Sequence, residues 1–104
     1  MAPSAENVLK ALAEPRRQQI LRLVRATPRS VGEIAEQVDI TQQAVSQHLQ
    51  VLKDAGLVAV RQAGTRRLYA IRPDGLESLE RFLAELWPTG LQRLKAAVEA
   101  DDRR

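Results

Sequence analysis

The feature of the sequence that most limits the fold is a pair of short helices, joined by a tight turn, between residues 30 and 55. Ser30 and Glu33 have the spacing of a capping box, in which each side chain accepts a hydrogen bond from the other residue's backbone N–H. Thr41 can cap a second helix in the same way, and only a tight turn fits between the two. Gly56 can take the left-handed conformation that ends this second helix. The pattern predicts a helix-turn-helix.

After residue 57 the spacing of apolar residues changes from helical to alternating. Val58, Val60 and Gln62 alternate with Ala59 and Arg61, residues 67–72 follow a similar spacing of two, and Gly64 lies in the turn between them, which indicates a β-hairpin with a basic tip. Residues 74–100 return to helical periodicity, and Pro88 interrupts them, so we expect a kink or two helices there. The fold class is therefore mainly α with a small β-hairpin.

Two short helices are expected before the helix-turn-helix. Ser4 can cap the first of them. Pro15 fits the first turn of the second, where its missing N–H costs little, and Pro28 follows the end of that helix.

The composition argues against several classes of protein. The chain has no cysteine, which removes disulfides and thiolate metal sites. No apolar run approaches the roughly 20 residues of a membrane-spanning helix, and the first residues lack the pattern of a signal peptide, so we expect a cytoplasmic protein. A Gly-rich phosphate loop and a convergent carboxylate pair are also missing, so we do not expect an enzyme.

The chain is basic, and most of its cations are arginine. Lys and Arg number 16 against 13 Asp and Glu, for a net charge of +3. Thirteen of the 16 cations are Arg, the residue best suited to phosphate and guanine recognition. A GC-rich genome would also favour Arg, so the charge alone decides little.

The second helix of the helix-turn-helix has one apolar and one amide-rich face. Val45, Leu49 and Leu52 fall on the inner side. The outer side carries amides and hydroxyls, and a Gln can bond adenine N6 and N7 together. The candidate base-contacting residues are Thr41, Gln42, Gln43, Ser46, Gln47 and Gln50. The alternative is that this face only confers solubility. The helix lies between a capped turn and a basic hairpin, however, and this position favours DNA recognition.

The hairpin and two capping positions offer further contacts to DNA. A ribbon beside a recognition helix can place Arg on phosphates or in a minor groove, and the candidates are Arg61, Thr65, Arg66 and Arg67. A hairpin with solvated charges is the alternative. Ser30 and His48 are candidate phosphate contacts, although the only histidine fits a packed or capping position better and is a poor metal ligand alone. Arg16, Arg17 and Arg29 are expected to be mainly solvated.

The C-terminal helical segment carries a longer apolar stripe than one small domain can cover. Left exposed, it would form a larger hydrophobic patch than monomers usually tolerate, which indicates a symmetric dimer. The predicted interface residues are Val8, Leu9, Leu12, Leu79, Phe82, Leu83, Leu86, Trp87, Leu91 and Leu94. Two recognition helices related by a two-fold axis would read a palindrome in double-stranded DNA. The alternative is a stripe that simply closes the core of a monomer.

Three stretches of the sequence resemble the ArsR-type repressors. VLKALAEPRR at residues 8–17 looks like their opening, and TQQAVSQHLQVL at 41–52 with AGLV at 55–58 looks like their recognition helix. GTRRLY at 64–69 is similar to their wing. The resemblance implies a winged helix-turn-helix domain over 1–104, with the helix-turn-helix at about 30–55, the wing at about 58–72 and dimerisation helices at about 74–100.

The resemblance also implies a function. Family members are bacterial repressors that dimerise through their first and last helices and bind inverted repeats, and many release DNA when metal binds. Here residues 30–35 hold no thiol and residues 74–100 hold no His, so both usual metal sites are missing and we expect no cofactor. The expected function is metal-independent repression by a homodimer on double-stranded DNA. The alternatives are a ligand- or metal-gated sensor of the same fold and a winged-helix module that binds proteins.

Overall fold

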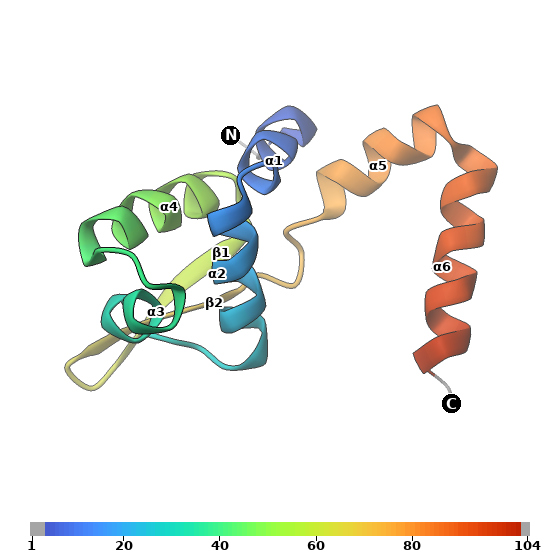
Figure 1. Ribbon diagram of the computed structural model, residues 1–104. Coiled ribbons are helices and arrows are strands. Elements are labelled where there is room, and N and C mark those ends of the chain that lie inside the picture. Colours follow the sequence, from blue (N-terminus) through green and yellow to red (C-terminus); the bar gives the residue numbers. More distant parts are fainter. Residues whose placement is uncertain (1–3, 103–104) are drawn as a thin grey trace.

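The computed structural model describes residues 4–102, apart from the side chains of Leu91 and Asp102. Four helices precede a two-stranded hairpin, and two more helices follow it (Figure 1). The elements are α1 (Ala5–Leu12), α2 (Pro15–Ala26), α3 (Val31–Val38), α4 (Gln42–Asp54), β1 (Val58–Ala63), β2 (Arg66–Ile71), α5 (Glu77–Leu86) and α6 (Pro88–Asp102). None of the helices in this part of the chain is long and apolar enough to cross a membrane.

The helices begin where the capping residues predict. Ser4 Oγ accepts from Asn7 N at 3.2 Å, and Thr41 Oγ1 accepts from Ala44 N at 3.0 Å. Pro15 is the first residue of α2, as expected, but the cap there is a residue that the sequence analysis did not single out. Glu14 Oε1 accepts from the N–H of Arg16 at 3.1 Å, and a carboxylate there also complements the partial positive charge of the helix N-terminus.

The end of α4 is a Schellman turn, and it directs the chain into the hairpin. Gly56 has φ 76°, and its N–H donates to Lys53 O at 2.9 Å. The N–H of Leu57 donates to Leu52 O at 2.9 Å. These two bonds satisfy carbonyls that the helix would otherwise leave free. The predicted left-handed role of Gly56 is thereby confirmed.

The hairpin is antiparallel and joined to a short third segment. Val58 pairs with Ile71 and Ala63 with Arg66, and Gly64 in the turn has φ 64°. Arg29 and Tyr69 exchange two backbone hydrogen bonds, of 3.0 and 2.8 Å, so the segment before α3 extends the sheet by one bridge. The sequence analysis did not find this bridge, because an isolated pair has no periodicity.

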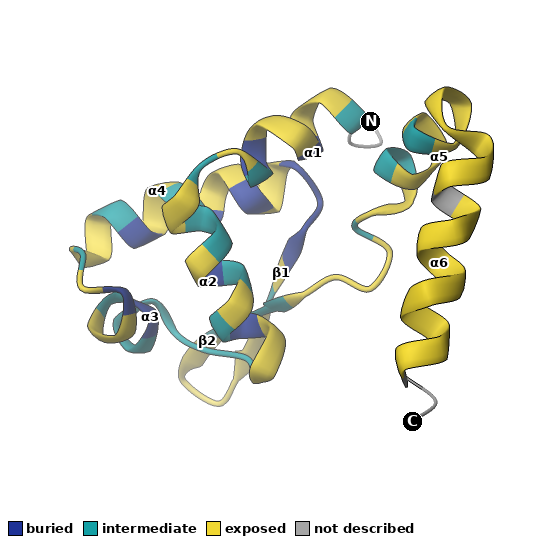
Figure 2. Ribbon diagram, turned by 45° about the vertical axis from the view of Figure 1, so that its right-hand side comes forward, coloured by how far each residue is buried: buried dark blue, intermediate teal, exposed yellow. Residues whose placement is uncertain are grey.

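The core lies among α1–α4 and the start of β1 and is aliphatic throughout. Its buried residues are Val8, Ala11, Ile20, Val24, Ile34, Val38, Val45, Leu49, Leu52, Ala55, Leu57 and Val58. Figure 2 shows the buried residues confined to this part, and every residue of α6 whose burial is described is exposed. Val8 is fully buried in the core of its own chain and has no surface to offer a partner, so its place in the predicted dimer interface is corrected.

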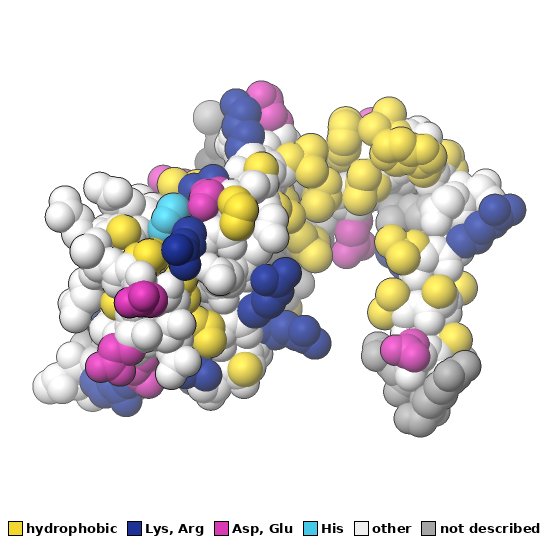
Figure 3. Space-filling view, in the orientation of Figure 1, with side chains coloured by type: hydrophobic (Ala, Val, Ile, Leu, Met, Phe, Trp, Pro, Cys, Tyr) yellow, Lys and Arg dark blue, Asp and Glu magenta, His cyan; other side chains and the backbone are white. Residues whose placement is uncertain are grey.

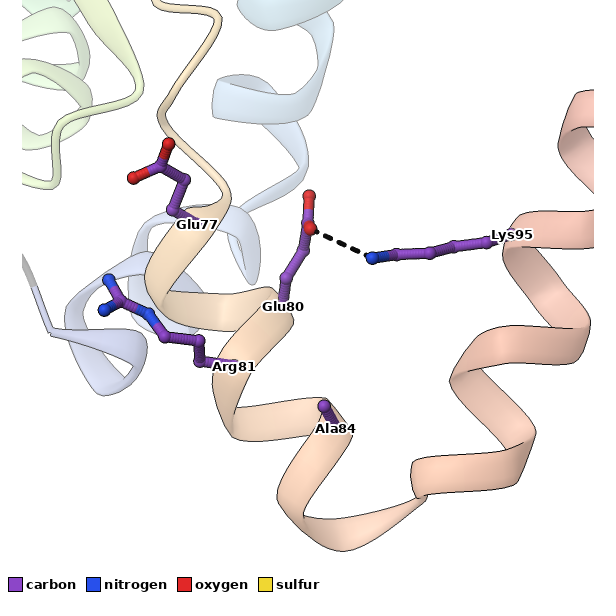
Figure 4. A pocket seen from close by; sticks show the side chains of 5 residues that line it. All are labelled: Glu77, Glu80, Arg81, Ala84 and Lys95. Atoms are coloured by element: carbon purple, nitrogen blue, oxygen red, sulfur yellow. Dashed lines mark ion pairs between the residues drawn. The ribbon is translucent and has the colours of Figure 1, made fainter.

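The C-terminal segment forms two helices, and α6 projects away from the core (Figure 1). The break occurs at Trp87 and Pro88, where Trp87 leaves the helical conformation and Pro88 begins α6. Glu80 Oε2 and Lys95 Nζ lie 3.3 Å apart and point toward one another between α5 and α6 (Figure 4). Asp101 and Asp102 continue α6 to its end, and Arg103 and Arg104 lie outside the described residues.

Candidate nucleic-acid interface

The turn between α3 and α4 fixes the direction of the second helix. Asp39 has φ 59°, and its N–H donates to Ala35 O at 3.0 Å. Asp tolerates this left-handed conformation better than most residues with a side chain. Ile40 then packs against the core that holds Val45, which anchors the first turn of α4. The turn thus holds α4 by its inner face and leaves the opposite face in solvent.

The outer face of α4 carries the side chains that the sequence singled out. Thr41, Gln42, Gln43, Ser46, Gln47 and Gln50 are all exposed. Three of them already have a local contact: Thr41 caps α4, Gln50 Nε2 donates to Asp54 Oδ1 at 2.8 Å, and the Gln42 amide lies over Gly32 at the start of α3. Gln43, Ser46 and Gln47 form no side-chain hydrogen bond within the described residues, so their donors and acceptors face water.

The capping box at the start of α3 also binds the hairpin. Ser30 N donates to Glu33 Oε1 at 3.1 Å, and Glu33 N donates to Ser30 Oγ at 3.3 Å. Glu33 Oε1 also forms an ion pair with Arg66 Nη2. The bond from the Ser30 N–H lowers the pKa of the Glu33 carboxyl, and the Ser30 side chain and the charges of Arg66 and Arg29 lower it further. Glu33 therefore stays ionised between the helix and the wing.

The cations of the hairpin are divided between its two faces. Opposite residues of an antiparallel pair share a face, so Arg61, which pairs with Leu68, lies on the same face as Arg66. Arg67 pairs with Gln62 and lies on the other face. The three arginines of the predicted basic tip therefore do not share one face, because Arg66 and Arg67 are adjacent in a regular strand. Thr65 is exposed in the turn.

His48 is half-buried and lies toward α2. Its Nδ1 is 3.5 Å from Nη1 of Arg17. Arg17 in turn donates from Nε to Ala11 O at 2.7 Å and from Nη2 to Lys10 O at 3.1 Å, the carbonyls at the end of α1. His48 is thus held beside the α1–α2 junction, away from the row formed by Gln43 and Gln47.

Two further arginines that were expected to be solvated also bind carbonyl groups. Arg16 Nη1 donates to Val38 O at 3.0 Å, at the end of α3. Arg29 Nε donates to Leu23 O at 3.2 Å, near the end of α2. The expectation of solvated side chains is therefore corrected for Arg17 and Arg29, which are half-buried, whereas Arg16 is exposed. Each satisfies a carbonyl of a final helical turn, where a cation is also favoured by the helix dipole.

Five of the ten apolar residues predicted to form an interface are exposed. Leu9, Phe82, Leu86, Trp87 and Leu94 all expose a third or more of their surface. Figure 3 shows hydrophobic side chains gathered on α5 and along α6. Leu12 and Leu79 pack partly against the core, Leu83 is half-buried, and the side chain of Leu91 lies outside the described part of the chain.

No group of three or more His, Cys, Asp or Glu residues in the described part of the chain is arranged to hold a metal ion. The remaining chemistry is that of hydrogen-bonding side chains and cations on an exposed helix and hairpin. These features define the class of protein: a winged helix-turn-helix, a fold whose second helix binds in the major groove of DNA.

Comparison with known proteins gives the family. Residues 12–61 match a family model described as a helix-turn-helix domain. The HTH-type transcriptional regulator Rv2034 of Mycobacterium tuberculosis is 38% identical over 98 residues, covering 94% of this chain and 92% of that protein. The chain belongs to the ArsR-type family of winged helix-turn-helix transcriptional regulators. This confirms the predicted fold class, and the relatives are regulators of transcription rather than enzymes.

Other relatives differ in the direction of regulation. The transcriptional repressor SdpR of Bacillus subtilis is 32% identical, covering 68% of this chain and 79% of that protein. The transcriptional activator HlyU of Vibrio cholerae is 34% identical, covering 77% and 74%. Among solved structures, a homodimeric winged helix-turn-helix DNA-binding domain from Mycobacterium bovis is 38% identical, with a TM-score of 0.64 and 77% of each chain covered.

Proposed function

We propose that the protein binds a palindromic operator in double-stranded DNA as a homodimer and represses transcription there without a metal. The observation that carries the proposal is the unbonded row of Gln43, Ser46 and Gln47 on the outer face of α4. In a major groove, an amide presents a donor and an acceptor together, which matches adenine N6 and N7. A neutral face also approaches the phosphates without repulsion.

The wing supplies contacts that do not depend on sequence. Arg61 is exposed and pairs with no acidic residue in the part of the chain that the structure describes. Arg67 and Thr65 lie at the tip of the hairpin. Arginine at such a tip binds phosphates or enters a minor groove, and each contact releases counterions, so DNA affinity will fall steeply with salt.

The dimer is proposed from the apolar surface of α1, α5 and α6. Leu86, Trp87 and Leu94 expose 53%, 60% and 61% of their surface, and adjoining residues extend this into a patch of the kind that marks an interface. The related Mycobacterium bovis domain is homodimeric. Two copies related by a two-fold axis would place their α4 helices about 34–36 Å apart, in successive major grooves.

We propose repression rather than activation, because repression needs only that the dimer occupies a promoter through its DNA-binding surface. Metal independence is proposed because the chain lacks Cys and its only His, His48, lies against Arg17. Titration of zinc, nickel and arsenite against the operator complex is expected to leave it intact. Release of DNA at micromolar metal would instead support the metal-gated alternative.

The experiment that tests the proposal is selection of bound fragments from the source genome, followed by titration of the recovered operator. We expect a palindrome. Gln43→Ala and Gln47→Ala should each weaken operator binding by about 1–3 kcal/mol and leave non-specific binding unchanged. Gln37→Ala is the matched control, because Gln37 is an exposed amide on α3 that faces α2. Equal effects of all three variants would contradict a recognition role for α4.

A further inference from the structure

An apolar cavity of about 440 Å³ lies beside α2. Its walls come from the end of α1, from α2, from the end of β2 and from the segment that leads to α5. The apolar residues that line it are Leu12, Leu21, Leu57, Ile71, Pro73 and Leu76. The volume lies within the range of about 300–1,000 Å³ that small-molecule sites occupy. The predicted DNA-contacting residues take no part in it.

The rim of this cavity is positively charged. Arg22, Arg25 and Arg72 line it, and no acidic residue does. Arg72 is held by Asp74: its Nε donates to Oδ1 at 3.2 Å and its Nη2 donates to Oδ2 at 2.9 Å. Arg22 and Arg25 are exposed and form neither an ion pair nor a hydrogen bond through their side chains within the described residues. Two free guanidinium groups beside an apolar cavity complement an anion that carries an apolar body.

The wall opposite α2 is fixed by backbone contacts. The N–H of Arg72 donates to Leu57 O at 3.0 Å, and the N–H of Gly75 donates to Arg72 O at 3.1 Å. The backbone of Gly75 comes so close to the α4–β1 turn that a Cβ at that position would lie 2.8 Å from Gly56 O. The segment 72–76 therefore has a defined position, and it joins the last strand of the wing directly to α5.

We propose that this cavity binds a small amphipathic organic anion, an aliphatic or aromatic carboxylate, and that its occupancy changes DNA affinity; the second half rests on the proposed function. The carboxylate binds at Arg22 and Arg25 while the apolar body fills the space between Leu21, Leu57 and Leu76. A ligand there contacts both the base of the wing and the start of α5. It therefore favours one orientation of the wing relative to the dimerisation helices over another. The change in DNA affinity is limited by the difference in ligand affinity between these two orientations.

The direct test is calorimetric titration of the full chain with octanoate, with 1-octanol as the uncharged probe of equal length. We expect one octanoate per chain and at least tenfold weaker binding of 1-octanol. Equal affinities would overturn the role of the cationic rim. Octanoate affinity that falls as protein concentration rises through the dimerisation range would show that a second copy covers the cavity, and would overturn the proposal.

Substitutions locate the site. Arg22→Gln with Arg25→Gln should weaken octanoate binding at least tenfold, and both side chains are exposed, so the fold is not at risk. Arg81→Gln with Arg93→Gln removes the same charge from α5 and α6, away from the cavity, and should change affinity less than twofold. Leu21→Trp fills the cavity and should also abolish binding. Equal losses in the two arginine pairs would mean that octanoate responds only to net charge, and would overturn the site.

The regulatory half is tested by titrating the selected operator with and without saturating octanoate. We expect at least a fivefold change in operator affinity, which the Arg22→Gln with Arg25→Gln variant should lose. Octanoate binding without any change in operator affinity would overturn the regulatory half. Operator binding without octanoate binding would overturn this inference and leave the proposed function standing. Octanoate binding by a protein that binds no operator would overturn the proposed function and leave the ligand site standing.

Discussion

Glu33 serves two elements at once, because it caps α3 through Ser30 and forms an ion pair with Arg66 of the wing. DNA would compete with Glu33 for that arginine. Glu33→Gln keeps an acceptor for the capping box but removes the charge that holds Arg66. We expect a severalfold increase in affinity for non-specific DNA at low salt. The slope of log K against log salt should steepen by about 0.9, the value for one added phosphate contact.

The matched control for this prediction is Glu36→Gln. Glu36 lies one turn further along α3, is exposed, and forms no ion pair within the described residues. The Glu36→Gln substitution removes the same charge as Glu33→Gln but releases no arginine. The salt slope of Glu36→Gln should therefore match that of the unaltered protein. A slope for Glu33→Gln that is equally unaltered would show that Arg66 gains no phosphate contact.

At the scale of single residues, the sequence predicted the contacts that are local and missed those that cross the fold. Ser30 and Thr41 were recognised as caps because each bonds a residue three positions away. The contact of Arg16 with Val38 O spans 22 residues, and that of Arg17 with His48 spans 31. Such contacts depend on how helices meet, which periodicity does not encode. The exposed amides of α4 were predictable because they follow from helical phase alone.

Among the elements, the segment between β2 and α5 is the most tightly constrained by a glycine. A Cβ on Gly75 would lie 2.8 Å from Gly56 O and 3.2 Å from the Cα of Leu57, and both neighbours are backbone atoms that cannot turn aside. Gly75→Ala should therefore lower the free energy of unfolding by about 1–3 kcal/mol, the usual cost of overpacking. Urea denaturation measures the change.

Gly32→Ala is the matched control within a helix. A Cβ there would lie 3.7 Å from the Gln42 amide, an ordinary contact, and Gly32 is the second residue of α3. Replacing a helical glycine by alanine should raise the free energy of unfolding by up to about 0.5–1 kcal/mol. The two variants should thus move stability in opposite directions. If both destabilise alike, the close approach at Gly75 is not the cause.

The capping box of α3 gives a pH dependence whose sign is fixed. The folded state lowers the pKa of Glu33 below its usual value of 4.5, mainly through the N–H of Ser30. Its contribution to stability is therefore complete above pH 4.5 and is lost as the pH falls through the folded pKa. Thermal unfolding of the protein and of Glu33→Gln should show a constant difference above about pH 5 that shrinks below pH 4.5. A difference that grows on acidification would contradict this assignment.

The elements themselves were largely predictable, since caps, a Schellman glycine and a switch of period mark their ends. The break between α5 and α6 was left open between a kink and two helices, because Pro88 allows both. The structure has two helices, in which Trp87 leaves the helical conformation and Glu80 pairs with Lys95 across the gap (Figure 4). Neither that ion pair nor the bridge between Arg29 and Tyr69 has a local signature in the sequence. Because that ion pair links α5 to α6, the direction of α6 could not be derived from the sequence.

On the scale of the whole molecule, most of the large exposed apolar residues lie on α1, on the two C-terminal helices or at the break between them, while Val51, Ile71 and Leu76 are exposed elsewhere. Leu9 lies on the outer side of α1, and Phe82 and Leu86 lie on α5, the helix that packs against α1. Val8, beside Leu9, points into the core instead. The proposed dimer interface that remains after this correction is a surface of α1, α5 and α6.

Leu86→Lys tests whether this surface joins two copies. Leu86 is 53% exposed within one chain, so a lysine there should not disturb the fold, but in a dimer it would bury a charge without a partner. Sedimentation should show a dimer for the unaltered protein and a monomer for Leu86→Lys at the same concentration, with the same helical content. Because one recognition helix reads only half of a palindrome, operator affinity should fall at least a hundredfold while non-specific binding persists. Gln92→Lys adds the same charge at a polar, exposed position of α6 and should remain dimeric; a dimeric Leu86→Lys would exclude α5 from the interface.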